Sequence, residues 1–191
     1  MLMFVVKKEG KHEETGVDLD ALIKSISEGS QIALEQLYRY TRSSVYSFAL
    51  SILKNTYDAE DVLQDCYIAV WHGVGNYRSQ EKPLAWILTI TRNLCLQQMR
   101  LRRKAADIPQ DEWEFHLPDN ECLTMEDKNV LSACMETLSD QERQIITLHA
   151  VSGLKHREIA ELLKLPLNTV LSKYHRTIKR LKNHLQQEGQ K

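Results

Sequence analysis

Apolar residues recur at intervals of three and four positions along most of the chain, which is the spacing of one face of an α-helix. The pattern is longest in residues 32–55, where the recurring apolar positions are Leu34, Leu37, Tyr38, Val45, Phe48, Ala49, Ile52 and Leu53. It returns in residues 58–74 and in residues 83–104. The strict alternation of apolar and polar residues that is typical of strands is scarce. The chain is therefore expected to be all-α.

Residues that begin and end helices divide the first half of this pattern into separate elements. Asp18 and Ser30 are of the types that cap helix N-termini, and Gly29 between them is expected to end a short first helix. Asp58 is expected to cap the helix at 58–74, and Pro83 suits the first turn of the helix that follows. These positions predict four helices before residue 105.

The charge along the chain is distributed unevenly. The net charge is only -1, yet residues 107–127 hold eight acidic residues and no lysine or arginine. A segment of this composition buries too little apolar surface to fold alone, so we interpret it as a linker between two domains. The expected organisation is a flexible tail at 1–17, a helical domain at 18–105, the acidic linker at 106–124 and a second helical domain at 125–187.

The second domain contains the pattern of a helix-turn-helix. Ser139 and Glu142 have the spacing of a capping box at the start of its first long helix, which Gly153 is expected to end. Two helices with a very short connection follow. Ala160 supplies a small residue where these two helices cross, and Pro166 opens the second of them.

The second helix of this motif has two distinct faces. Its apolar stripe consists of Val170, Tyr174, Ile178 and Leu181, and its polar face carries Asn168, Thr169, Ser172, Lys173 and Arg176. Residues 155–182 hold eight lysines and arginines against two glutamates, which suits phosphate contacts. The pattern favours a DNA recognition helix, and the alternative is an ordinary solvated basic face. Lys164 stands where the motif commonly has glycine, so the turn is expected to close without glycine's freedom at positive φ.

Other classes of protein are disfavoured by composition. The cysteines Cys66, Cys95, Cys122 and Cys134 are far apart, which predicts buried thiols instead of a disulfide framework or zinc site. The histidines lack the spacing of metal ligands or of a catalytic triad, so we expect no enzyme, metal or cofactor, and a hydrolase is a remote alternative. No apolar run approaches the roughly 18 residues of a membrane span, and residues 1–6 make a poor signal peptide. A cytoplasmic protein without membrane insertion is expected.

Two separated stretches resemble bacterial RNA polymerase sigma factors of the extracytoplasmic-function (ECF) type. DAEDVLQDCYIAVW, followed by WILTITRN and a basic tail, is similar to the sigma-2 domain of that family. LSDQERQIITLHAVSGLKHREIAELLKLPLNTVLSKYHRTIKRL is similar to the sigma-4 domain. The resemblance implies a non-catalytic protein that binds core RNA polymerase and directs promoter-specific transcription initiation in response to a stress or envelope signal. The alternative is a free-standing helix-turn-helix regulator.

The resemblance also implies roles for particular residues. The helix with Asp61, Gln64 and Asp65 would dock on the clamp helices of the largest polymerase subunit, and the spacing of these residues predicts one polar face, for which the alternative is an ordinary solvated acidic surface. Residues 76–82 and the helix after them would recognise and melt the promoter's minus-ten element. The residues implied in minus-ten binding are Asn76, Tyr77, Arg78, Arg92, Asn93, Arg100 and Arg103. Tyr77 is expected to stack on an extruded base, whereas Trp86 is expected to lie in the core.

Further partners follow from the same resemblance. The recognition helix, with Asn168, Thr169, Ser172, Lys173 and Arg176, would bind the minus-thirty-five element, and the flap of the second-largest polymerase subunit is a further expected contact. An anti-sigma factor is the expected regulator. The acidic linker would either imitate RNA in the polymerase channels or serve as a solvated spacer.

Overall fold

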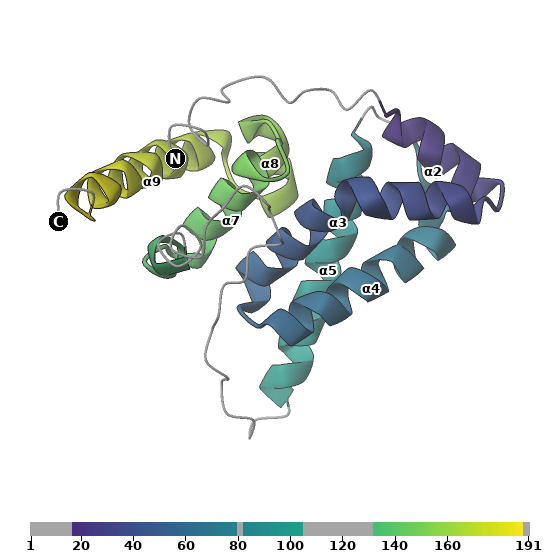
Figure 1. Ribbon diagram of the computed structural model, residues 1–191, viewed down its shortest axis with the longest axis horizontal. Coiled ribbons are helices and arrows are strands. Elements are labelled where there is room, and N and C mark those ends of the chain that lie inside the picture. Colours follow the sequence, from purple (N-terminus) through teal and green to yellow (C-terminus); the bar gives the residue numbers. More distant parts are fainter. Residues whose placement is uncertain (1–16, 80–81, 105–131, 189–191) are drawn as a thin grey trace.

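A computed structural model describes residues 17–79, 82–104 and 132–188, and every regular element in these ranges is helical (Figure 1). The all-α prediction is therefore confirmed. Residues 1–16 and the predicted linker at 106–124 lie outside the described residues. The elements are α2 (Leu19–Ser27), α3 (Gln31–Leu53), α4 (Thr56–Gly73), the short 3-10 helix η1 (Val74–Asn76), α5 (Pro83–Lys104), α7 (Asp140–Ala150), α8 (His156–Leu163) and α9 (Leu167–Glu188).

The first two helices begin at their predicted caps. An oxygen of Asp18 accepts a hydrogen bond from the backbone nitrogen of Ala21 (3.1 Å), and the hydroxyl of Ser30 accepts one from Ala33 (3.2 Å). Gly29 lies between α2 and α3 with a φ of 91°, a conformation that glycine adopts without steric cost. The predicted boundary between α2 and α3 is confirmed.

The predicted cap of α4 is wrong. The helix begins at Thr56, and the side chain of Asn55 accepts the hydrogen bond from the backbone nitrogen of Asp58 (2.9 Å). Asn55 has the extended backbone that a cap requires, whereas Asp58 already lies in the first helical turn. The Asp58 carboxylate is buried there and forms an ion pair with Arg102 of α5 (2.5 Å).

Helices α3, α4 and α5 pack on one another, and α2 packs against α3 and α5. We call residues 17–104 the first half of the protein. Val62, Cys66 and Val70 of the predicted α4 stripe are buried, and Leu63 and Ala69 are partly buried. Burial raises the pKa of the Cys66 thiol to about 11, so this thiol stays protonated near neutral pH.

Helices α7, α8 and α9 form the second half, residues 132–188. The predicted capping box is present at the start of α7, because the Glu142 carboxylate accepts a hydrogen bond from the backbone nitrogen of Ser139 (3.0 Å). The same carboxylate lies 3.2 Å from a guanidinium nitrogen of Arg180. This ion pair links α9 to the beginning of α7.

The two halves are in contact, with α7 against α3 and α8 against α5 (Figure 1). Their buried side chains form common clusters: Ala49 and Leu50 of α3, for example, belong to the same cluster as Leu138 and Ile146. Lys54 at the end of α3 lies 2.7 Å from Asp140 at the start of α7. The described conformation is therefore a closed one, in which the apolar core is continuous from one half to the other.

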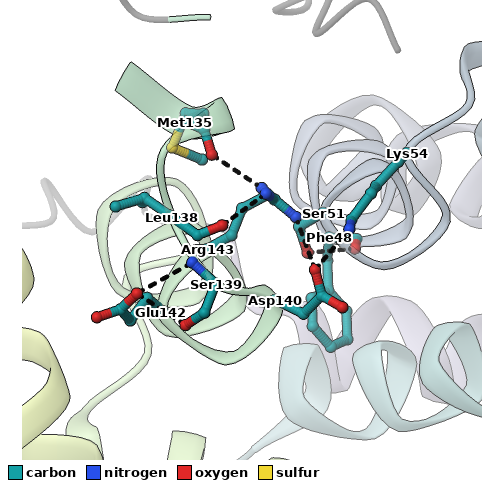
Figure 2. A network of polar contacts seen from close by, with 9 residues as sticks. All are labelled: Phe48, Ser51, Lys54, Met135, Leu138, Ser139, Asp140, Glu142 and Arg143. Carbon is teal, nitrogen blue, oxygen red and sulfur yellow. Dashed lines mark hydrogen bonds and ion pairs between the residues drawn. The ribbon is translucent and has the colours of Figure 1, made fainter. Parts of the chain in front are cut away.

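A buried arginine supports the α7 side of this contact (Figure 2). The Nε of Arg143 donates to the carbonyl of Met135 (3.1 Å) and its Nη2 donates to the carbonyl of Leu138 (2.8 Å). Its Nη1 lies 3.2 Å from the Asp140 carboxylate that also pairs with Lys54. Because its hydrogen bonds run to carbonyls, the guanidinium fixes the turn before α7 and orients Asp140.

Candidate functional surfaces

The helix-turn-helix is formed by α8 and α9. Lys164 ends α8 with a φ of 56° and a ψ of 44°, so the turn uses a left-handed residue despite the absence of glycine, contrary to the expectation. The backbone nitrogen of Leu165 closes this turn on the carbonyl of Ala160 (3.0 Å). A left-handed conformation costs an L-residue about 1–2 kcal/mol. Ile159 and Val170, which lie on either side of this turn in the chain, are both buried.

The polar face of α9 points to solvent. Asn168, Ser172 and Arg176 are exposed, and Thr169 and Lys173 are partly exposed. On the other side of the helix, Val170 and Leu181 are buried and Tyr174 and Ile178 are partly buried, so the predicted division into two faces is confirmed. The guanidinium of Arg176 donates to the carbonyl of Ser172 (3.2 Å), one turn earlier. The exposed face presents cations and hydroxyls near the helix N-terminus, as a recognition helix requires.

A cluster of aromatic rings lies behind α9 and was missed by the sequence reasoning. The imidazoles of His149 and His156 are stacked with their centroids 4.5 Å apart, and the ring of Tyr174 packs edge-on against both. Burial and the neighbouring imidazoles of His149 and His175 lower the pKa of His156. These ring contacts join α7, α8 and α9 into one unit.

The predicted polar face of α4 is also exposed. Asp61, Gln64 and Asp65 lie on the side of the helix opposite its buried stripe. Two exposed apolar residues flank them, Tyr57 at 76% exposure and Ile68 at 57%. Each of the five residues lies three or four positions from another of them, so they share one face. Exposed apolar side chains beside carboxylates are typical of a protein-binding surface, and the interval of four between Tyr57 and Asp61 was the signal that the sequence reasoning overlooked.

The loop before α5 is held by a contact with α2. The hydroxyl of Tyr77 donates to the carboxylate of Asp20 (2.6 Å), and its ring lies against the indole of Trp86, with the centroids 4.7 Å apart. Burial and the Asp20 carboxylate raise the pKa of Tyr77 above its usual value. Asn76 and Arg78 on either side are exposed, and Trp86, expected in the core, is only partly buried. The loop thus presents a fixed aromatic ring between exposed polar side chains.

Helix α5 continues from this loop with further polar groups. Asn93 and Arg100 are exposed and lie seven residues apart, which places them on the same face as Trp86. Arg92 is partly exposed, and the side chain of Arg103 lies outside those described. The described candidate residues form a polar and basic track that runs along α5 from the Tyr77 loop.

Comparison with known proteins identifies the family. The Sigma-70 region 2 family model matches residues 37–105, and the Sigma-70, region 4 model matches residues 128–181. An ECF RNA polymerase sigma factor, SigK of a Mycobacterium species (strain KMS), is 32% identical over 180 residues, which cover 88% of this chain and 91% of the relative. The chain belongs to the ECF family of RNA polymerase sigma factors. It is therefore a transcription initiation factor that directs polymerase to promoters, and a free-standing regulator is not favoured.

Solved structures agree with this sigma factor fold. CnrH in complex with the cytosolic domain of CnrY is 24% identical, with a TM-score of 0.61 over 88% of this chain and 98% of that one. The sigma factor RpoE of Bartonella quintana, in complex with the anti-sigma factor NepR, is also 24% identical, with a TM-score of 0.66 over 80% of this chain and 96% of that one. Within the described residues of the present sigma factor, none of the helices has the length and hydropathy needed to cross a membrane.

Proposed function

We propose that this sigma factor docks on core RNA polymerase through α4, captures the opened minus-ten strand with the Tyr77 loop and α5, and binds the minus-thirty-five element with α9. It performs no catalysis itself and acts in the cytoplasm. Its promoter class serves a response to a stress or envelope signal. The observation that carries the proposal is the presence of three exposed surfaces of different chemistry on the two matched regions.

The docking role of α4 is supported by its mixture of charge and apolar surface. Asp61 and Asp65 supply negative charge for a basic partner surface, and Tyr57 and Ile68 supply apolar area that is otherwise costly to leave in water. The intended partner is the pair of clamp helices of the largest polymerase subunit. The flap of the second-largest subunit is proposed as a second contact.

The DNA-binding roles are supported by the chemistry of the exposed groups. An aromatic ring beside a basic track is the usual arrangement for holding a single strand, and Tyr77 at the start of α5 provides that ring. Lys173 and Arg176 on α9 provide cations for phosphates and base edges of the duplex. Strand capture and duplex recognition are thereby assigned to different halves of the protein.

CnrH and RpoE, which share this fold, were solved in complex with the cytosolic domain of CnrY and with the anti-sigma factor NepR, respectively. We extend this kind of regulation to the present protein and propose that an anti-sigma factor binds it and masks its polymerase-docking surface.

The proposal is tested by adding the purified protein to core RNA polymerase. Co-elution on size exclusion, together with new transcripts from a genomic template library, is the expected result. A protein that binds duplex DNA but neither co-elutes with polymerase nor starts transcription would contradict the docking assignment.

A further inference from the structure

In the closed conformation, α8 faces the loop that we assign to minus-ten binding. Lys82 at the start of α5 lies 3.1 Å from the carboxylate of Glu161 on α8. A cleft of about 420 Å³ between these elements is lined by Asn76, Tyr77 and Trp86 on one side and by Glu158 and Glu161 on the other. The assigned strand-binding loop therefore opens into a cleft whose opposite wall carries two glutamates.

The chemistry of that wall opposes nucleic acid. A single strand that followed the basic track of α5 would bring its phosphates toward the two carboxylates, and like charges across an interface are unfavourable. Glu161 also pairs with the lysine ammonium that a phosphate would otherwise contact. The two carboxylates thus repel the phosphates of the strand, and Glu161 competes with them for the ammonium of Lys82.

The contact between α3 and α7 keeps α8 in this position. Its ion pair between Lys54 and Asp140 is largely exposed, and such pairs contribute little on their own. The larger contribution comes from side chains that are fully buried in the shared clusters, among them Phe48, Leu50 and Ile145. Separating the halves exposes this apolar surface, so the closed state is favoured when no partner covers it.

The other two proposed surfaces remain open in the same conformation. Asp61, Gln64 and Asp65 on α4 are exposed, as are Asn168 and Arg176 on α9. The closed state consequently obstructs strand capture while it leaves polymerase docking and duplex contacts accessible.

We propose that α8 is an autoinhibitory shield: Glu158 and Glu161 occupy the approach of the single strand, and the second half must move away from the first before the minus-ten loop can bind DNA. This inference rests on the proposed function, because it assumes that the loop is the strand-binding site. Binding of polymerase or promoter duplex to both halves at once would provide the free energy that separates them.

A reversible tether between the halves tests the shield. Lys54→Cys and Asp140→Cys replace the partners of the exposed ion pair, and a short bis-maleimide with an internal disulfide joins them. Cys122→Ser removes a native thiol, and the thiols of Cys66, Cys95 and Cys134 are buried. The single-cysteine proteins, blocked with a monofunctional maleimide, serve as controls.

The tethered protein, assembled with core polymerase on a promoter that the untreated protein transcribes, is expected to open the promoter about ten-fold less or worse, as measured by permanganate reactivity of thymines. Reduction of the tether is expected to restore opening. Equal opening before and after reduction would overturn the shield. Co-elution of the reduced protein with core polymerase is measured separately, and its failure would overturn the proposed function together with the inference that rests on it.

Charge removal provides a second test with a probe that needs no known promoter. Glu158→Gln with Glu161→Gln keeps hydrogen-bond acceptors on α8 but removes both charges, whereas Glu136→Gln removes an exposed charge that does not line the cleft. The double variant is expected to bind a fluorescent randomised 20-nucleotide single strand about two- to five-fold more tightly at low salt, with no such gain for Glu136→Gln. Equal affinities would contradict the electrostatic part of the proposal.

Discussion

The hydroxyl of Tyr77 donates a 2.6 Å hydrogen bond to the carboxylate of Asp20, although 57 residues separate them in the chain. The bond fixes the loop before α5 to α2. The indole of Trp86, in the first turn of α5, packs against the phenol ring of Tyr77. An aromatic side chain fixed in this way loses little conformational entropy when a base stacks on it. The proposed role of Tyr77 in strand capture can therefore be tested separately from its hydrogen bond to Asp20.

Replacement of Tyr77 is expected to impair promoter opening without affecting polymerase binding. Tyr77→Ala removes a stacking surface whose loss costs about 1–3 kcal/mol per base, whereas Tyr77→Phe keeps the ring and loses only the bond to Asp20. Permanganate footprinting is expected to show weak thymine reactivity for Tyr77→Ala and Asn76→Ala and near-normal reactivity for Tyr77→Phe. Tyr40→Ala, at an exposed tyrosine of α3, is the control. Normal opening by Tyr77→Ala would remove this loop from the melting machinery.

Charge reversal on α4 is expected to abolish docking and spare the fold. Asp61 and Asp65 are exposed, so their replacement by lysine is expected to change the free energy of unfolding by no more than about 0.5 kcal/mol. Against a basic partner surface, the same change creates like-charge contacts that cost several kcal/mol. The double variant should keep its helical circular dichroism and fail to co-elute with core polymerase.

A matched control for docking is available in the same half of the protein. Glu28→Lys with Glu35→Lys makes an identical change in net charge at two exposed positions, one just after α2 and one in α3. This control is expected to co-elute normally. Loss of co-elution in both double variants would mean that polymerase binding depends on the net charge of the protein and not on the α4 face.

Local features of this fold were predictable because they depend on residues close together in the sequence. The caps at Asp18 and Ser30, the capping box at Ser139 and the two faces of α9 all follow from spacings of three and four. The cap of α4 was misassigned because Asn55 and Asp58, three residues apart, both belong to the capping types, and only the backbone conformation distinguishes them.

Contacts between distant segments were not predictable from spacing. Nothing near Asp20 indicates that its carboxylate accepts a bond from Tyr77, and nothing near Lys54 indicates that it faces Asp140. The acidic composition of residues 107–127 predicts a linker but carries no information about whether the two apolar cores meet. The closed arrangement of the halves was for this reason visible only in three dimensions.

Alanine substitution on α9 is expected to weaken promoter binding in two distinguishable ways. If Lys173→Ala or Arg176→Ala removes a base contact, binding is expected to weaken by about 1–3 kcal/mol. If it removes a phosphate contact, the slope of log binding constant against log salt concentration is expected to become shallower by about one. Affinity for promoter duplex measured over a range of salt concentrations separates the two. Lys179→Ala, beyond the proposed recognition face, is the comparison. Unchanged affinity and salt dependence for both Lys173→Ala and Arg176→Ala would support an ordinary solvated face.

The two left-handed lysines provide a stability test. Lys54 and Lys164 both have a φ of 56°, and glycine at such a position avoids the steric cost of an L-residue. Because glycine also raises the entropy of the unfolded chain, the expected gain for Lys164→Gly is about 0.5–1 kcal/mol in chemical denaturation. Lys54→Gly should gain less, since it also removes the ion pair with Asp140. A loss of stability in Lys164→Gly would show that its side chain makes a compensating contact.

The Glu142 carboxylate gives the second half an acid-sensitive connection between α7 and α9. Partial burial alone would raise its pKa, but hydrogen bonds from Ser139 and the ion pair with Arg180 outweigh this and lower the pKa to about 2, from 4.5. A carboxylate whose pKa is lower in the folded than in the unfolded state stabilises the protein at any pH above its unfolded-state pKa. This stabilisation disappears as the pH falls toward the folded-state pKa.

Glu142→Gln is therefore expected to lower the melting temperature at neutral pH, by an amount that corresponds to about 1 kcal/mol. The difference from the natural protein should narrow as the pH falls from about 4.5 to about 2, because the natural side chain then becomes neutral as well. Glu136→Gln, at an exposed position just before α7, is the control, and its melting temperature is expected to stay equally close to that of the natural protein throughout this pH range. Melting curves by circular dichroism at a series of pH values measure both, and a difference for Glu142→Gln that stays constant through this range would contradict the assigned ion pair.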